Sequence, residues 1–150
     1  MLTWERGHFF YEAWIARYGL LQGLLTTAEL SAIVIVAGSL LGALGGLCLV
    51  YGALPLRLIV RLYVDVMRGI PVLVLILFTY YGLALFAIDI SAFTAGAIAL
   101  GGFCAAHMAE TVRGAIQSLP RGQTEAAMAI GLRFWQRLRY VILPLAVRRT

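Results

Sequence analysis

Three long runs of uncharged and mostly apolar residues dominate the pattern along this chain. They cover residues 30–56, 69–88 and 90–109, and Asp89 alone separates the last two. A helix needs roughly 20 apolar residues to cross a bilayer, and each run meets that length. One such run could be a buried helix of a soluble protein, whereas three favour a membrane protein. We therefore predict an all-α membrane protein, a multi-span helical bundle with spans at 20–50, 70–88 and 92–112.

Charge is scarce and unevenly placed. Charged residues make up 13% of the chain, hydrophobic residues 62%, and the mean hydropathy is +0.91. The formal net charge of +5 comes from arginines that mostly follow the first and third runs. Because basic residues concentrate on the cytoplasmic side of membrane proteins, the N-terminus is predicted outside and the arginine-rich segments inside. This placement explains the pI near 9.7 without a nucleic-acid partner, and the bilayer is the predicted partner.

The segments on either side of the first span are expected at the two membrane surfaces. Residues 1–19, with Trp14 and Tyr18 on one helical face, are predicted to form an interfacial helix on the outer leaflet; a flexible terminus is the alternative. Residues 51–69 are predicted to be the first cytoplasmic connection. That connection contains a helical segment in which Asp65 pairs with Arg61 or Arg68.

Small residues at four-residue spacing predict close helix packing. Gly38, Gly42 and Gly46 form a doubled GxxxG stripe on the first span. The stripe can face a helix of this chain or of a partner subunit, and the spacing does not decide between them. The third span is also rich in small residues, which is typical of a helix packed inside a bundle.

Polar residues inside the second and third spans are candidates for a substrate pathway. His107 and Glu110 lie three residues apart on the third span, so they share a helix face. They are either a site for a polar ligand or an interfacial pair in which Arg113 is the partner of Glu110, and the second interpretation is favoured. Three further residues, which either line a pathway or pack, interrupt the second span: Thr79, Tyr80 and Tyr81.

The chain has no motif for catalysis or cofactor binding. Cys48 and Cys104 lie inside apolar runs without metal-ligand spacing, and they are interpreted as packing residues. There is no phosphate-binding loop of the form G-x-x-x-x-G-K-[ST]. We therefore expect no metal, no cofactor and no catalytic site.

The segment after the third span predicts a compact helical knob. Pro120 and Gly122 stop the third helix, and residues 125–130 form a short helix with small residues on one face. Gly131 can adopt positive φ and turn the chain. A second helix, basic and aromatic, covers residues 132–140, and Pro144 opens the next segment.

The run EAAMAIGLRFWQRLRYVILP resembles the cytoplasmic EAA loop of bacterial ABC-importer permeases. Val141 stands where that family usually has Ile. The segment MRGIPVL is similar to the FRGTPLL-like element of the polar amino-acid permeases, with Ile70 replacing the usual Thr. The stretch AHMAETVRGAIQSLPRGQTEAA also parallels their pattern, with His107 in place of Tyr. The matched anchors of the loop are Glu125, Ala126, Ala127, Gly131, Leu143 and Pro144.

The resemblance implies a permease bundle of the ABC type I importer kind, in the polar amino-acid (histidine, glutamine, arginine or opine) uptake family. Residues 113–143 are then the cytoplasmic loop that receives an ABC ATPase subunit. The other implied partners are a second permease subunit, the same or homologous, and an extracytoplasmic solute-binding protein, at the bacterial inner membrane. Family members usually carry two more spans, so residues 144–150 are expected to start a fourth, truncated span. The alternatives are a non-transport assembly or structural subunit, a membrane enzyme, or an ABC permease for another small solute.

Overall fold

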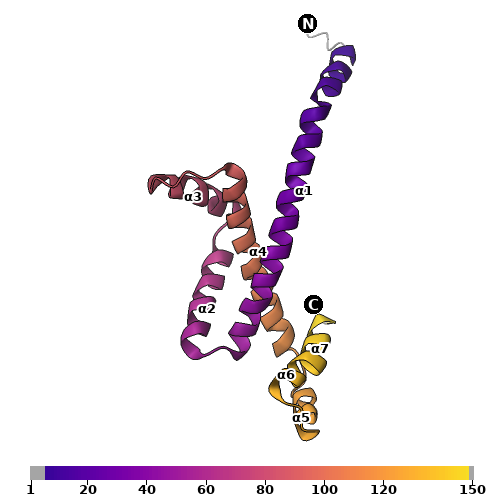
Figure 1. Cartoon of the computed structure of the whole chain (residues 1–150), viewed down its shortest axis with the longest axis vertical. Coiled ribbons are helices and arrows are strands. Elements are labelled where there is room, and N and C mark those ends of the chain that lie inside the picture. The colour runs from indigo at the N-terminus through magenta and orange to yellow at the C-terminus, as the bar shows by residue number, and fades with distance from the viewer. Residues whose placement is uncertain (1–5, 149–150) are drawn as a thin grey trace.

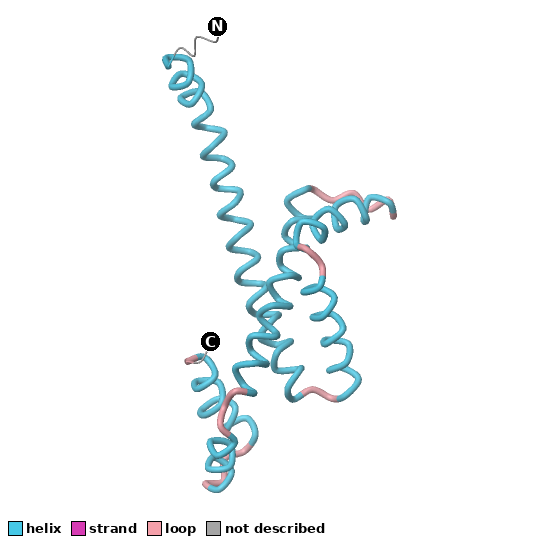
Figure 2. The backbone as a smooth tube through the Cα atoms, turned by 180° about the vertical axis from the view of Figure 1, so that it is seen from behind, coloured by secondary structure: helices cyan, strands magenta, loops and turns pink. Residues whose placement is uncertain are grey.

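The computed structural model describes residues 6–148 and contains helices and short connections, with no strand in that part of the chain (Figures 1 and 2). The predicted all-α architecture is confirmed. α1 and α4 cross side by side, and the last helices lie at the end opposite the N-terminus. The elements are α1 (Arg6–Tyr51), α2 (Leu54–Gly69), α3 (Val72–Leu85), α4 (Ala92–Gln117), α5 (Arg121–Ala129), α6 (Phe134–Arg137), the π-helix η1 (Leu138–Ile142) and α7 (Leu143–Val147).

Two helices are long and apolar enough to cross a membrane: Ala16–Tyr51 within α1, and α4. They contain the residues expected for the first and third spans. The separate helix expected at residues 1–19 has no boundary with the first span, because α1 runs unbroken from Arg6. Gly19 is tolerated inside the helix, and no proline interrupts it. Residues 1–5 lie outside the described part.

The second span differs from its prediction. α3 has 14 residues, which extend about 21 Å against a bilayer core of about 30 Å. α2 and α3 pass the test for a span only together, with a bend of 107° between them. Ile70 is extended at the bend (φ −103°, ψ 132°), as expected for a residue before proline, and Pro71 precedes the first turn of α3.

α2 is the segment expected to be a cytoplasmic connection, and it instead folds back along α4. Pro55 lies in its first turn, where the missing N–H is not needed, so this proline starts a helix. The Arg57 guanidinium donates to the Gly52 carbonyl over 3.0 Å and closes the turn after α1. Val64 is 1% exposed against α4, and the Tyr63 hydroxyl donates to the Gly102 carbonyl over 2.7 Å.

The glycine stripe packs on α4 of this chain. A Cβ added at Gly38 would lie 2.8 Å from Cys104 Cβ, and one at Gly42 would lie 2.5 Å from Met108 Cβ. At Gly46 the same atom would lie 2.6 Å from Val112 Cβ and 2.7 Å from the Ala109 carbonyl oxygen. The helices therefore approach so closely that even a methyl group would force them apart. This contact decides between the two partners that the spacing left open.

Candidate coupling site and charged cluster

α5, α6, η1 and α7 form the helical knob that the sequence predicts, and its turn is at Gly131. The φ of Gly131 is 81°, the left-handed conformation that glycine adopts without a steric penalty. The Gly131 N–H donates to the Met128 carbonyl (2.9 Å) and the Leu132 N–H to the Ala127 carbonyl (3.1 Å). These two bonds are the Schellman pattern of a helix C-terminus. The turn keeps Leu132 and Arg133 out of the second helix, which begins at Phe134 and not at residue 132.

Pro144 lies inside a helical run and does not open a new segment. It occupies the first turn of α7, which continues directly from η1. Because proline has no N–H and its ring crowds the carbonyl four residues earlier, an α-helix is strained there. The chain widens into a π turn just before it, in which the Leu143 N–H donates to the Leu138 carbonyl.

An apolar cluster fastens the knob to the ends of α4 and α1. Ala115 and Ile116 of α4 are buried against Leu138, Ile142 and Ala146, each at most 8% exposed. Leu47 and Val50 of α1 pack on the same cluster, as does Leu143. Both long helices are therefore in contact with the knob through side chains that exclude water.

The anchors of the EAA run divide between the surface and the interior of the knob. Ala127 is 3% exposed and faces inward, so its side chain is not part of the exposed surface of the knob. Glu125, Ala126, Gly131 and Pro144 are exposed, and Ile130 beside them is 77% exposed. The surface is therefore a short apolar ridge with a carboxylate next to it.

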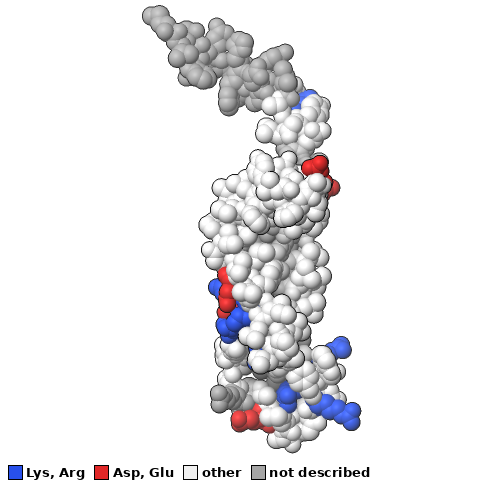
Figure 3. Space-filling view, turned by 90° about the vertical axis from the view of Figure 1, so that its left-hand side faces the viewer, with Lys and Arg blue, Asp and Glu red and all other residues white. Residues whose placement is uncertain are grey.

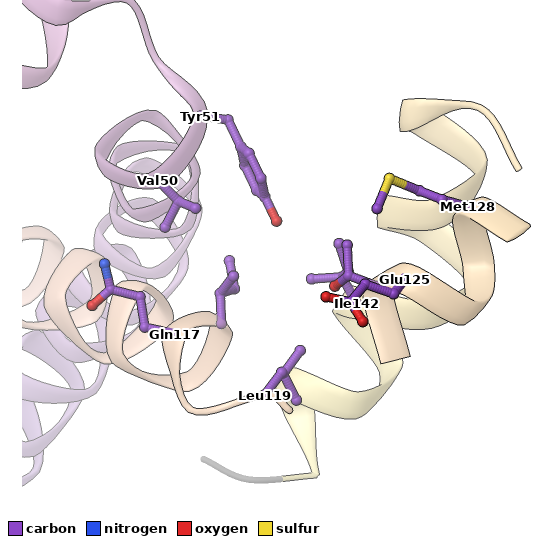
Figure 4. Close-up of a pocket in the computed structure, with 9 residues that line it drawn as sticks. Val50, Tyr51, Gln117, Leu119, Glu125, Met128 and Ile142 are labelled. Carbon is purple, nitrogen blue, oxygen red and sulfur yellow. The ribbon is translucent and has the colours of Figure 1, made fainter. Parts of the chain in front are cut away.

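A hollow of about 560 Å³ separates α5 from the ends of α1 and α4 (Figure 4). Glu125 and Met128 line it on the knob side, and Val50 and Tyr51 line it on the α1 side. The remaining lining residues are Ile116, Gln117, Leu119, Thr124 and Ile142. The hollow therefore lies between α5 on one side and the ends of α1 and α4 on the other.

Glu110 is the centre of a charged cluster between α4 and α2. Arg113 Nε donates to Glu110 Oε2 over 2.8 Å, which confirms the partner favoured from the sequence, and Arg113 Nη2 also donates to Oε1. Arg68 of α2 lies 3.7 Å from the same carboxylate. Figure 3 shows blue and red atoms grouped below a broad uncharged band.

The pairing of Arg68 with Glu110 was not predicted from the sequence. The spacing of residues within α2 had suggested Asp65 as the partner of Arg68. Within residues 6–148 no ion pair joins Asp65 to Arg61 or Arg68. Three charged residues of α2 share one helix face, because they are spaced by four and three residues: Arg61, Asp65 and Arg68. That periodicity was a signal that α2 places its charges against another element.

The other pathway candidates do not converge on this cluster. His107 is exposed, and its Nδ1 lies 3.0 Å from the Phe103 carbonyl oxygen, not against Glu110. Thr79 donates to the Leu75 carbonyl over 2.8 Å, and Tyr80 and Tyr81 stack edge to face at 5.0 Å. These three residues lie on α3, at the end of α4 opposite the knob (Figure 1).

The chain is similar to known transport proteins over most of its length. The family model described as "Binding-protein-dependent transport system inner membrane component" matches residues 34–150. The Glutamine transport system permease protein GlnP of Escherichia coli (strain K12) is 35% identical over 91% of this chain and 63% of GlnP. The Probable amino-acid ABC transporter permease protein YckA of Bacillus subtilis (strain 168) is 36% identical over 86% of this chain and 57% of YckA. The chain thus spans less than two thirds of these relatives.

Solved structures support the same assignment. "Crystal structure of an amino acid ABC transporter with histidines" matches with a TM-score of 0.79 and 36% identity, covering 89% of this chain and 64% of that one. The MetNI methionine ABC transporter in inward-facing conformations shares the fold, with a TM-score of 0.71 and 24% identity over 88% of this chain and 64% of that one. The predicted helical bundle of the ABC-importer permease kind is confirmed. With most of its length matched by one family model, the chain belongs to the binding-protein-dependent transport system inner membrane components.

Proposed function

We propose that this chain is a permease subunit of an ATP-driven importer of polar amino acids, and that its helical knob receives the ATPase subunit. The attachment of the knob supports this most directly. Its apolar cluster joins Leu138 and Ile142 to Ala115 and Ile116 of α4 and to Leu47 of α1. A displacement of the knob therefore displaces both long helices, because packed interiors transmit strain.

The proposed partners follow from the same arrangement. An ABC ATPase subunit contacts the ridge of Glu125, Ala126 and Ile130 and supplies the hydrolysis. A second permease subunit, the same or homologous, completes the walls of the pathway, and an extracytoplasmic solute-binding protein delivers substrate. The similarity to amino-acid ABC permeases supports a polar amino acid as substrate.

Within the chain, the charged cluster is the best-supported part of the proposed substrate pathway. Charged side chains are expensive in lipid, so they face a water-filled path or another protein. Glu110 and Arg68 together offer both signs of charge, which suits the ammonium and carboxylate of an amino acid. Thr79, Tyr80 and Tyr81 stay as proposed contacts farther along that path, and His107 stays as a proposed contact one helical turn from Glu110.

The proposed orientation places the N-terminus outside and the knob in the cytoplasm. The knob and the N-terminal end of α1 lie at opposite ends of the molecule (Figure 1), and arginines are concentrated in the knob. Single cysteines replacing Glu12, Asp89 and Gln123, in a background without Cys48 and Cys104, test this with an impermeant thiol reagent on intact cells. We expect labelling at the first two positions, and labelling at position 123 would reverse the orientation.

Glu125→Lys tests the coupling role in the assembled importer. Reversing this exposed charge is expected to uncouple ATP hydrolysis from uptake, with membrane insertion unchanged. The matched control is Gln123→Lys, which adds a positive charge at another exposed position of α5. Normal uptake by the Glu125→Lys importer contradicts the proposal, and an equal loss in both variants would show a general effect of charge on α5.

A further inference from the structure

The charged cluster between α2 and α4 holds more positive than negative charge. Arg61 acts on the Glu110 carboxylate through space, and Asp65 acts on Arg113, so both belong to the cluster. Its members are three arginines and two acids: Arg61, Arg68, Arg113, Asp65 and Glu110. The cluster therefore keeps one positive charge that its own carboxylates do not neutralise.

The Glu110 carboxylate is already paired. Both of its oxygens accept hydrogen bonds from Arg113, Oε2 from Nε over 2.8 Å and Oε1 from Nη2. Arg113 Nη1 also donates to Gln117 Oε1, which holds the guanidinium from its other side. A bidentate pair of this kind fixes both groups in one geometry. Although the cluster contains both signs of charge, its central carboxylate is thus neutralised and held in place.

Arg68 has hydrogen-bond donors to spare and is open to a ligand. Its Nη1 lies 3.7 Å from Glu110 Oε1, too far for a hydrogen bond. Within residues 6–148 its guanidinium donates no hydrogen bond, so it does not cap the carbonyls at the end of α2 either. Its side chain is 43% exposed, against 21% for that of Arg113. A molecule that enters the cluster from outside therefore meets Arg68 first.

The depth of the cluster makes an acceptor for Arg68 necessary. Glu110 lies seven residues before the end of α4, a candidate span, which is about 10 Å along the helix. Hydrocarbon offers no acceptor to a guanidinium at this depth, so Arg68 faces a path along which an acceptor can come. The planar fork of a guanidinium matches a carboxylate in geometry as well as in charge.

We propose, building on the import function proposed above, that Arg68 binds the substrate carboxylate and that the cluster selects acidic amino acids over cationic ones. Arg113 holds Glu110, and Glu110 positions Arg68 between α2 and α4. An acidic amino acid neutralises the excess positive charge of the cluster, whereas a cationic amino acid adds to it. Glutamine, which has nearly the shape of glutamate without the side-chain charge, falls between the two.

The test is equilibrium dialysis of radiolabelled L-glutamate, L-glutamine and L-arginine against the assembled importer, without a solute-binding protein that would itself bind them. The wild-type importer is expected to bind glutamate most tightly and arginine least. Arg68→Gln is expected to weaken glutamate binding about tenfold, the effect of one hydrogen bond to a charged group, so that the advantage over arginine is lost. Arg68→Lys keeps the charge without the fork, and glutamate is expected to stay ahead of arginine.

The matched control is Arg57→Gln, because Arg57 also lies on α2 but donates to the Gly52 carbonyl. It is expected to leave the order of the three ligands unchanged. Arg61→Gln serves if Arg68→Gln does not assemble, because Arg61 is exposed and forms no ion pair within residues 6–148. Removing this more distant charge is expected to lower the advantage of glutamate over arginine about twofold.

An unchanged preference for glutamate in Arg68→Gln overturns the proposal. An equal loss of all three ligands also overturns it, because Arg68 would then only hold α2 on α4. A wild-type importer that binds arginine most tightly contradicts the selectivity but leaves amino-acid import standing. Binding of none of the three ligands contradicts the proposed amino-acid substrate as well.

Discussion

The two halves of α1 carry the same packing motif and use it differently. Gly19 and Gly23 in the outer half are four residues apart, as are Gly38, Gly42 and Gly46 in the inner half. A Cβ at Gly23 would meet nothing within 4 Å, whereas one at Gly42 would meet α4 at 2.5 Å. Leu20 and Leu24 beside the open glycines are 67% and 66% exposed.

The difference between the two halves lies in the partner helix, α4, and not in α1 itself. α4 begins at Ala92 and presents Gly101, Ala105 and Ala109 to the inner glycines. Leu30 lies beside Gly96, only four residues after α4 begins, so the outer half of α1 extends past the start of α4 (Figure 1). A GxxxG motif therefore marks a face that can pack closely, and a complementary row of small residues decides whether it does.

The largest expected loss of stability comes from adding a methyl group to a glycine in the inner half of α1, and the same change in the outer half is its control. Gly42→Ala is expected to destabilise the α1–α4 pair by about 1–3 kcal/mol, because the new methyl group overlaps Met108 and the Ala105 carbonyl. Gly23→Ala is the matched control and is expected to cause no loss. The measurement is the midpoint of unfolding in an SDS titration followed by circular dichroism. Equal midpoints for the two variants would remove the distinction between the halves.

A variant at Gly131 tests whether the space around a glycine or its backbone conformation decides the cost of adding a methyl group. Gly131 has nothing within 4 Å of an added Cβ, as at Gly23, but its φ is 81°. Gly131→Ala is expected to cost about 1–2 kcal/mol through the left-handed conformation alone and to weaken co-purification of the ATPase. Wild-type yield of the ATPase with this variant would show that open space, and not φ, decides the tolerance of a glycine here.

The smallest expected loss of stability comes from a variant of α2, the helix that packs on another side of α4. Tyr63→Phe removes the hydroxyl that donates to the Gly102 carbonyl but keeps the ring in place. The expected loss is about 1 kcal/mol in the same titration, the usual net value of one hydrogen bond. A loss as large as that of Gly42→Ala would mean that α2, and not the glycine stripe, holds α4.

The features that depend on nearby residues were predictable from the sequence. The Gly131 turn and the Glu110–Arg113 pair involve positions at most five residues apart, so local geometry determines them. The partner of the glycine stripe was not predictable, because periodicity identifies a face and not what covers it. The pairing of Arg68 with Glu110 depends on α2 folding back along α4, and the 107° bend at Pro71 depends on how α3 packs. A proline predicts an interruption but not its angle.

The contact between α1 and α4 also has a consequence for biogenesis. Val112 is translated roughly 65 residues after Gly46, a delay of about 3–13 s at the usual rate of synthesis. During that time the glycine face lies in the bilayer without its partner. Gly38, Gly42 and Gly46 place no polar side chain in contact with lipid. The first helix can therefore wait in the membrane at little free-energy cost, and α1 and α4 join when the later helix is inserted. Arg68 differs from the glycine face, because it is charged and has no carboxylate partner until Glu110 is synthesised.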